Sequence, residues 1–175
     1  MEEVSLEKWK TEDSNRLSVI GTSRKICDYL SDSFPYPYSK EKAENYIMKS
    51  LENKNAEIRA IIYNNEIVGS IGVYFMDDIY RENGKIAYFL GEKYWNQGIT
   101  TKAISLICDY VFSNYQSIHR ICADPFDTNM GSIRVLEKNG FILEGILREN
   151  VIKNGKHLNS SMYGLLRKEF YQKRD

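Results

Sequence analysis

Several features that would narrow the class of a protein are missing from this 175-residue sequence. It has no excess of charge, because 24 Lys and Arg residues are matched by 24 Asp and Glu residues. Nucleic-acid binding usually needs a basic excess that neutralises phosphates, so we expect no nucleic-acid partner. No apolar run approaches the ~18 residues of a membrane-spanning helix, and the N-terminal residues lack the pattern of a secretory signal. We therefore expect a cytoplasmic protein without a membrane partner.

Cysteine, histidine and proline are also scarce. Cys27, Cys108 and Cys122 are odd in number and widely spaced, which is typical of reduced structural thiols. None of them stands with His119 or His157 in the pattern of a zinc site, so we expect no metal. The sequence contains no repeat and no linker rich in Pro, Gly or Ser, which indicates one domain over residues 1–175.

The periodicity of the apolar residues predicts a domain of mixed α and β structure. Helical spacing is found over 14–30, 39–51, from near Thr100 to 112, and over about 130–139. Runs of β-branched and aromatic residues predict a hairpin within 56–75 and further strands over 85–91, 118–123, 142–152 and 156–166. Antiparallel hairpins on both sides of one β-α-β passage indicate an α+β (mixed α/β) fold.

The passage from strand to helix over 86–112 carries the strongest chemical signal. A tight loop after a strand brings backbone N–H groups and a helix N-terminus to one point, where an anion can bind. Gly98 allows the backbone to approach a ligand closely, and Thr100 and Thr101 are suited to a helix cap. Most turns with a single glycine only connect elements, so this passage by itself identifies no ligand.

Two longer tracts, LGEKYWNQGITTKAI and TNMGSIRVLEKNGFILEGILRE, resemble the two signature regions of the GNAT acyl-CoA-dependent N-acetyltransferases. They are similar in particular to the branch that contains the ribosomal-protein N-terminal (alanine/serine) acetyltransferases. In that branch a Trp precedes the pyrophosphate loop and N-x-x-S-x-x-x-L-E-K-x-G-F follows one strand later. The FPYPY loop and the closing MYGLLRKEF extend the resemblance over most of the chain. It implies a GNAT-like fold, with a central twisted, mostly antiparallel sheet of about six or seven strands and about four flanking helices.

The resemblance implies that the chain binds acetyl-CoA and uses no metal. The loop 96–101 would wrap the pyrophosphate of coenzyme A, and the strand 87–90 would pair with its pantetheine arm. Asn129 would bind the arm from the other side, and Lys102, Arg134 and Lys138 are the nearest candidates for the remote phosphate. The residues expected to bind the cofactor are Tyr88, Phe89, Leu90, Trp95, Asn96, Gln97, Gly98, Ile99, Thr100, Thr101, Asn129, Ser132 and Lys138.

The resemblance also implies a set of catalytic groups. A main-chain N–H near Phe89 or Leu90 would hold the thioester oxygen as charge develops on it. Many relatives carry a Tyr acid seven residues after the Asn, where this sequence has Leu136. Ser132 would instead donate a hydrogen bond to the leaving sulfur. The base is less determined: Glu149 is the first candidate, and Asp77 or Asp78 is the second. The expected catalytic residues are thus Ser132, Glu149 and Leu90.

The sequence departs from the family pattern at several further positions. Asn96 and Thr100 replace small residues in the pyrophosphate loop. Asn159 and Lys85 stand where relatives often carry Asp and Glu, so two carboxylates that could line the acceptor site are missing. These departures leave open a protein that binds acyl-CoA, or serves as an interaction module, without turnover.

The acceptor is expected to be a primary amine, attacked directly in a ternary complex because no cysteine belongs to the matched motifs. The resemblance favours a protein N-terminal α-amine, with a small molecule such as an amino acid, polyamine or antibiotic as the alternative. The aromatic loop is either a rigid connector or a wall of the acceptor site. Under the second interpretation the substrate-binding residues are Phe34, Tyr36, Tyr38 and Asp77. A homodimer and an acyl group other than acetyl are left open.

Overall fold

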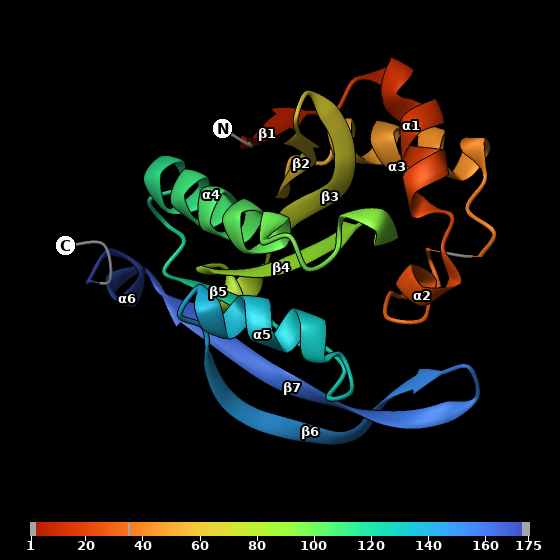
Figure 1. The fold of residues 1–175 in the computed structure, drawn as a ribbon. Helices are drawn as coiled ribbons and strands as arrows, with labels where there is room; N and C mark the ends of the chain where they lie inside the picture. The colour runs from red at the N-terminus through yellow and green to blue at the C-terminus, as the bar shows by residue number, and fades with distance from the viewer. Residues whose placement is uncertain (1–2, 35, 173–175) are drawn as a thin grey trace.

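The computed structural model describes residues 3–34 and 36–172, and its seven strands form a single twisted sheet (Figure 1). The strand order is β1-β2-β3-β4-β5-β7-β6, and every neighbouring pair is antiparallel except the parallel pair β4–β5. The strands are β1 (Val4–Lys8), β2 (Ala56–Tyr63), β3 (Glu66–Phe75), β4 (Asn83–Leu90), β5 (Arg120–Ala123), β6 (Ile142–Lys153) and β7 (Lys156–Leu166). The predicted mixed, mostly antiparallel sheet is confirmed.

Helices cover both faces of this sheet. In the described part of the chain there are six: α1 (Ser14–Gly21), α2 (Arg24–Cys27), α3 (Lys40–Glu52), α4 (Ile99–Asn114), α5 (Met130–Lys138) and α6 (Arg167–Gln172). One core lies between the sheet and α4, α5 and α6, and a second lies between the sheet and α1, α2 and α3. Short 3₁₀ turns η1 (Thr11–Asp13), η2 (Asp78–Tyr80) and η3 (Glu92–Tyr94) complete the elements. No helix among the described residues is long and apolar enough to span a membrane.

The predicted long helix is confirmed as α4, and its apolar stripe forms the centre of the first core. Its buried side chains are Ile99, Ala103, Ile104, Ile107, Cys108, Val111 and Phe112. The three cysteines are all buried and none forms a disulfide, as reduced structural thiols should. A helical stripe can be read from sequence because side chains three and four apart lie on one face.

Three elements differ from the prediction. The helix expected over 14–30 is broken after Gly21 and ends at Cys27, because the chain packs tightly where the helix would continue. A Cβ on Gly21 would lie 2.7 Å from the ring of Tyr38, and Thr22 Oγ1 donates a hydrogen bond to the Tyr38 carbonyl at 3.1 Å. Strand β1 and helix α6 were not predicted, because segments of five and six residues are too short to establish a period.

The most consequential feature of the sheet is the separation of β4 from β5. Only Asn83, Gly84 and Lys85 of β4 pair with β5, and residues 86–90 continue without a partner strand on that side. On its other edge β4 stays paired with β3 along its whole length. The two strands approach so closely at Gly69 that an added Cβ would lie 2.3 Å from the Phe89 carbonyl oxygen. The sheet therefore opens in its middle while β4 itself remains firmly held.

Candidate functional site

The opened edge of β4 presents main-chain groups in a definite pattern. Gly91 N–H donates to the Val68 carbonyl at 2.8 Å, and Met76 N–H donates to the Asn83 carbonyl at 2.9 Å, so odd-numbered positions of β4 face β3. Successive main-chain groups of a strand point to opposite edges, so the N–H groups of Tyr88 and Leu90 point into the gap. Of the two main-chain N–H groups expected near the thioester oxygen, that of Leu90 points into the gap and that of Phe89 points toward β3.

The loop that follows β4 is shaped by two residues in the left-handed region. Asn96 has a φ of 61° and Gly98 has a φ of 77°. A Cβ built on Gly98 would meet nothing within 4 Å, so the space beside it is open. Trp95 secures the start of the loop, since its Nε1 donates to the Leu90 carbonyl at 2.8 Å.

The loop ends at the N-terminus of the 16-residue helix α4. Gly98 is the N-cap, and no side chain caps this end of the helix. The first N–H groups of a helix lack acceptors within the helix and carry its positive dipole end. A loop and a helix end arranged in this way can bind an anion without lysine or arginine, which is the role expected of this passage from the sequence.

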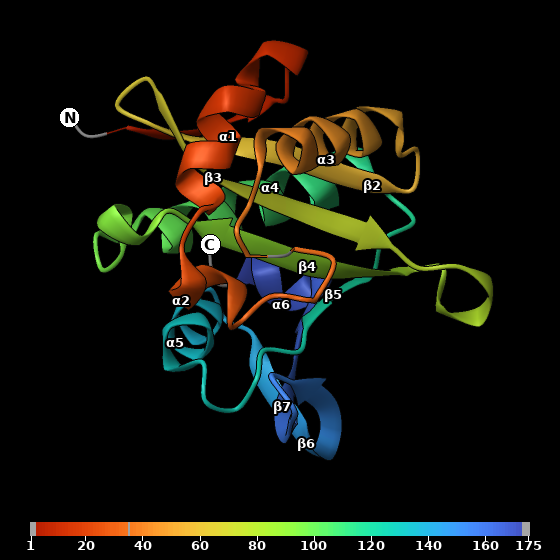
Figure 2. The same ribbon diagram turned by 90° about the vertical axis from the view of Figure 1, so that its right-hand side faces the viewer.

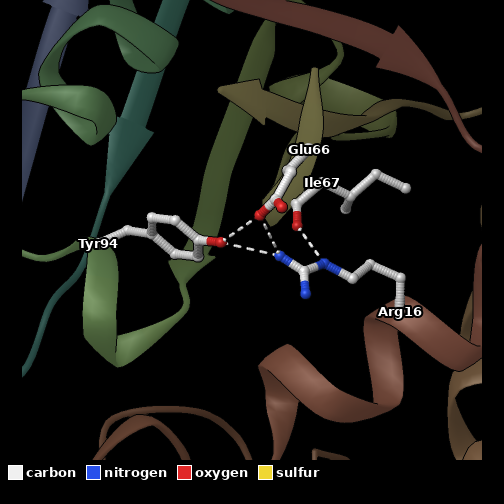
Figure 3. A network of polar contacts seen from close by, with 4 residues as sticks. All are labelled: Arg16, Glu66, Ile67 and Tyr94. Atoms are coloured by element: carbon white, nitrogen blue, oxygen red, sulfur yellow. Dashed lines mark hydrogen bonds and ion pairs between the residues drawn. The ribbon is translucent and has the colours of Figure 1, made fainter. Parts of the chain in front are cut away.

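A polar network holds the turn before this loop against the rest of the protein (Figure 3). Arg16 Nη2 of α1 donates to Glu66 Oε2 at 2.9 Å and to Tyr94 Oη at 2.8 Å, and Tyr94 Oη donates to Glu66 Oε2 at 2.8 Å. Arg16 Nε also donates to the Ile67 carbonyl at 2.8 Å. The Tyr94 hydroxyl and the Arg16 guanidinium hold the pKa of the Glu66 carboxyl below its ordinary value. Sequence analysis missed this network because its members lie 28 to 78 residues apart.

A second set of contacts joins the same turn to α2. Glu92 of η3 accepts a hydrogen bond from Ser23 Oγ at 2.9 Å and forms an ion pair with Lys25. These two donors hold the pKa of the Glu92 carboxyl below its ordinary value. The cationic side chains in this region therefore serve to fix the scaffold of the loop.

The opposite wall of the gap is the N-terminus of α5. Asn129 Oδ1 accepts a hydrogen bond from Ser132 N–H at 3.1 Å and so caps the helix, a role that the sequence analysis did not assign. The Ser132 hydroxyl lies 2.7 Å from the Tyr88 hydroxyl of β4. Ser132 of the second tract thus stands across from the opened strand, and Asn129 caps the helix that carries it.

The far end of α5 lies beside the first turn of α4. Asn139 Nδ2 donates to the Thr101 carbonyl at 3.1 Å and to the Val135 carbonyl at 2.8 Å. The preceding residue, Lys138, is exposed, as is Lys102 in the first turn of α4. Lys138 thus lies next to a residue that contacts the first turn of α4. The hydrogen bond by which Asn139 joins α5 to α4 was not predicted from the sequence.

A pocket of about 300 Å³ lies between α2 and the turn that joins β6 to β7. In Figure 1 this turn lies below α2. Two contacts bridge the pocket: Lys153 Nζ lies 2.8 Å from Asp32 Oδ1, and Asn154 Nδ2 donates to Asp28 Oδ1 at 3.0 Å. Its lining residues are Arg24, Cys27, Asp28, Asp32, Phe34, Tyr36, Lys153 and Asn154.

The aromatic loop buries two of the three rings expected to contact the substrate. Phe34 and Tyr38 are buried and stack on each other with ring centroids 4.0 Å apart. Phe34 also packs against Phe89 of β4 at 4.9 Å, so it supports the opened strand from behind. Only Tyr36 exposes its ring, at 52% of its surface, while Pro35 lies outside the described residues. The break in the helix at Gly21 makes room for the two buried rings.

The candidate bases lie on different elements, Glu149 on β6 and Asp77 and Asp78 in the turn between β3 and β4. Glu149 is exposed at a bulge of β6, with a φ of 50°, and its N–H donates to Asn159 Oδ1 at 2.9 Å. Asn159 Nδ2 in turn donates to Asp127 Oδ2 at 2.9 Å. A carboxylate could not make both contacts, which gives the Asn at this position a structural reason.

Asp77 is not brought to the pocket. It follows β3 in the turn toward β4, on the right of Figure 2, whereas α2 lies on the left. Asp78 lies in the same turn. The geometry therefore does not support the expected substrate contact of Asp77, because the turn precedes the paired part of β4 and lies away from the pocket. Among the described residues, no group of three His, Cys, Asp or Glu side chains could hold a metal ion.

Comparisons with known proteins agree with this geometry. The family model described as "Acetyltransferase (GNAT) domain" matches residues 3–142. The chain belongs to the GNAT acetyltransferase family. The predicted family and its mixed α/β fold are thereby confirmed, and family membership supports an acyltransferase over a module without turnover.

Two known proteins show how similar the chain is to individual relatives. The probable N-acetyltransferase YjcK of Bacillus subtilis (strain 168) is 39% identical over 89 residues, which cover 51% of this chain and 49% of YjcK. A structure of RimL, a ribosomal L7/L12 alpha-N-protein acetyltransferase in complex with coenzyme A, has a TM-score of 0.84 at 20% identity, covering 93% of each chain. At that identity the likeness shows a shared fold.

A further structure broadens the range of neighbours. The microcin C7 self immunity acetyltransferase MccE, in complex with acetyl-CoA and AMP, has a TM-score of 0.80 at 25% identity, covering 94% of this chain and 92% of that one. The neighbours therefore include a protein acetyltransferase and one crystallised with a nucleotide. The cytoplasmic location and the homodimer stay predictions.

Proposed function

We propose that the protein transfers the acetyl group of acetyl-CoA to the N-terminal α-amine of a protein. The observation that carries the proposal is the opened edge of β4, which leads directly into a left-handed loop and the uncapped N-terminus of α4. A chain-like arm can pair with such an edge while its pyrophosphate lies on the helix end. This combination fits coenzyme A, which carries both parts.

The residues available for the acetyl donor follow from that arrangement. The N–H groups of Tyr88 and Leu90 would bind the pantetheine arm, and the N–H groups of residues 96–101 would bind the pyrophosphate. Lys138 would lie nearest to the remote phosphate. The side chain of Ile99 is buried, so its contribution would come from the main chain alone.

The chemistry needs an amine in line with the thioester, a donor for the carbonyl oxygen and a partner for the sulfur. Leu90 N–H would donate to the carbonyl oxygen as the amine nitrogen attacks the carbonyl carbon. The carbon–sulfur bond then breaks with its electron pair on sulfur, where the Ser132 hydroxyl would donate a hydrogen bond. Glu149 would take the proton of the amine, directly or through water.

We assign the acceptor to the pocket between α2 and the turn that joins β6 to β7, and the charges of this pocket favour an α-amine over a polycation. Its two carboxylates already have partners within the protein, Asp32 with Lys153 and Asp28 with Asn154. An α-amine has a reference pKa of about 8, so an appreciable fraction is neutral near pH 7, whereas alkyl amines near 10.4 are almost fully protonated. An α-amine therefore asks less of the base than an alkyl amine does.

The size of the pocket favours a second candidate, a small-molecule amine. About 300 Å³ is at the lower end of the range for small-molecule sites. An amino acid or a similarly compact amine would fill such a pocket, whereas a protein would place only its first residue or two there. This candidate and the first share every residue proposed for the acetyl donor.

An acceptor panel tests the proposed function. Release of free thiol from acetyl-CoA should be fastest with peptides that have a free N-terminus. The same peptides with a blocked N-terminus and an internal lysine should give no more thiol than a reaction without acceptor. Higher kcat/KM with amino acids, polyamines or aminoglycosides would transfer the assignment to the small-molecule class, and no turnover with any amine would contradict the acetyltransferase.

The anion site can be tested at Gly98. Replacement by alanine makes the left-handed conformation roughly 1–2 kcal/mol less favourable, so the open loop of the free protein should leave this conformation and return to it on binding, which should weaken coenzyme A binding by about tenfold in calorimetry. Gly155, with a φ of 73° and equally open surroundings, is the matched control. Gly155→Ala should lower the free energy of unfolding by a similar amount and leave coenzyme A affinity unchanged. Equal affinities in both variants would contradict the assignment.

The base can be tested by the dependence of kcat/KM on pH. Glu149→Gln should lower kcat by about 10²-fold and remove the acidic limb of the profile, because that limb reports protonation of the base. Asp78→Asn serves as the comparison, since Asp78 was the rival candidate and lies away from the pocket. An acidic limb that survives in Glu149→Gln would exclude Glu149, and its loss in Asp78→Asn would assign the role there.

A further inference from the structure

The hydrogen bond between Tyr88 and Ser132 joins the two walls of the gap. Tyr88 belongs to the part of β4 that has left β5, and Ser132 lies in the first turn of α5. Their hydroxyl oxygens are 2.7 Å apart, although the residues are 44 positions apart in the sequence. Any ligand in the gap beside β4 would therefore lie next to this pair.

The chemistry of the two hydroxyl groups indicates the direction of the bond. A phenol is a far stronger acid than an alkyl hydroxyl and hence the better donor. Burial raises the pKa of the Tyr88 phenol above its ordinary value, so it keeps its proton at neutral pH. When Tyr88 donates to Ser132 Oγ, the proton of the serine hydroxyl must point elsewhere.

The main chain fixes the other end of the pair. Ser132 N–H is held by Asn129 Oδ1 at 3.1 Å, and Asn129 N–H donates to the Phe126 carbonyl at 2.8 Å. Ser132 is thus held at both its backbone and its hydroxyl. Leu136, one turn further along α5, is completely buried and has no polar group, so α5 supplies no second hydroxyl at that position.

We propose that Tyr88 is a positioning residue for acetyl transfer, which donates to Ser132 Oγ and thereby directs the serine proton to the thioester sulfur. The inference rests on the proposed function and adds a residue to it. As the carbon–sulfur bond breaks and its electron pair moves to sulfur, the hydrogen bonds from Tyr88 to Ser132 and from Ser132 to sulfur strengthen together. Neither hydroxyl gives up its proton, and the amine proton goes to the base.

The chain contains a matched control for this pair. Tyr46 of α3 lies with its hydroxyl 2.8 Å from Ser70 Oγ of β3, in the second core on the other side of the sheet. Burial raises the pKa of the Tyr46 phenol as well. Loss of either phenol hydroxyl removes one Tyr–Ser bond, but only the Tyr88 pair lies at the gap.

The test is a comparison of Tyr88→Phe, Tyr46→Phe, Ser132→Ala and the double variant Tyr88→Phe/Ser132→Ala. With an acceptor that the wild-type protein acetylates, Tyr88→Phe should lower kcat by about tenfold and leave the KM for acetyl-CoA within about twofold. Tyr46→Phe should leave kcat unchanged. The double variant should have the same kcat as Ser132→Ala, because Tyr88 acts only through the serine.

Each contrary result has a distinct meaning. Absence of turnover by the wild-type protein with every amine contradicts the proposed function. Turnover by the wild-type protein with equal kcat in Tyr88→Phe and Tyr46→Phe overturns the positioning role alone. A further tenfold loss on adding Tyr88→Phe to Ser132→Ala also overturns it, since the effect would then not pass through Ser132. Urea unfolding of all four variants shows whether the changes in kcat are separate from changes in stability.

Discussion

The separation of β4 from β5 after three residue pairs is the constraint on which the rest of the site depends. A continuous ladder would use the N–H groups of Tyr88 and Leu90 for pairing within the sheet, and no ligand could bind along that edge. The opening is tolerated because β3 holds β4 on one side and β7 holds β5 on the other. Phe34 packs against Phe89 from the second core, so the strand is supported where it has lost a neighbour.

The balance of charges shows how a neutral chain can offer a site to a polyanion. Arg16 and Lys25 are paired with Glu66 and Glu92, and these pairs hold the turn before α4. The loop and helix end that we propose for the pyrophosphate offer main-chain N–H groups, which need no net charge. Lys153 is likewise paired with Asp32 across the pocket between α2 and the β6–β7 turn. A net charge of zero is therefore compatible with a site for a phosphate-rich ligand.

The parts of the fold and of the site that depend on local patterns could be predicted from the sequence. The stripe of α4, the turn at Gly98 and the N-x-x-S tract each depend on neighbouring residues, and each can be located from the sequence alone. The pocket between α2 and the β6–β7 turn could not be foreseen, because Asp32 and Lys153 are 121 residues apart and belong to no motif. The burial of Phe34 and Tyr38 depends on tertiary packing at Gly21, which no periodicity reports.

The central claim is that the opened edge of β4 binds the arm of coenzyme A, and amide hydrogen exchange of residues 86–90 tests it most directly. In the free protein the Phe89 amide, which faces β3, should exchange slowly, and the Tyr88 and Leu90 amides should exchange faster. Saturating coenzyme A should slow exchange at Tyr88 and Leu90 and leave Phe89 unchanged. Unchanged exchange at Tyr88 and Leu90, with coenzyme A shown to be bound by calorimetry, would contradict the account.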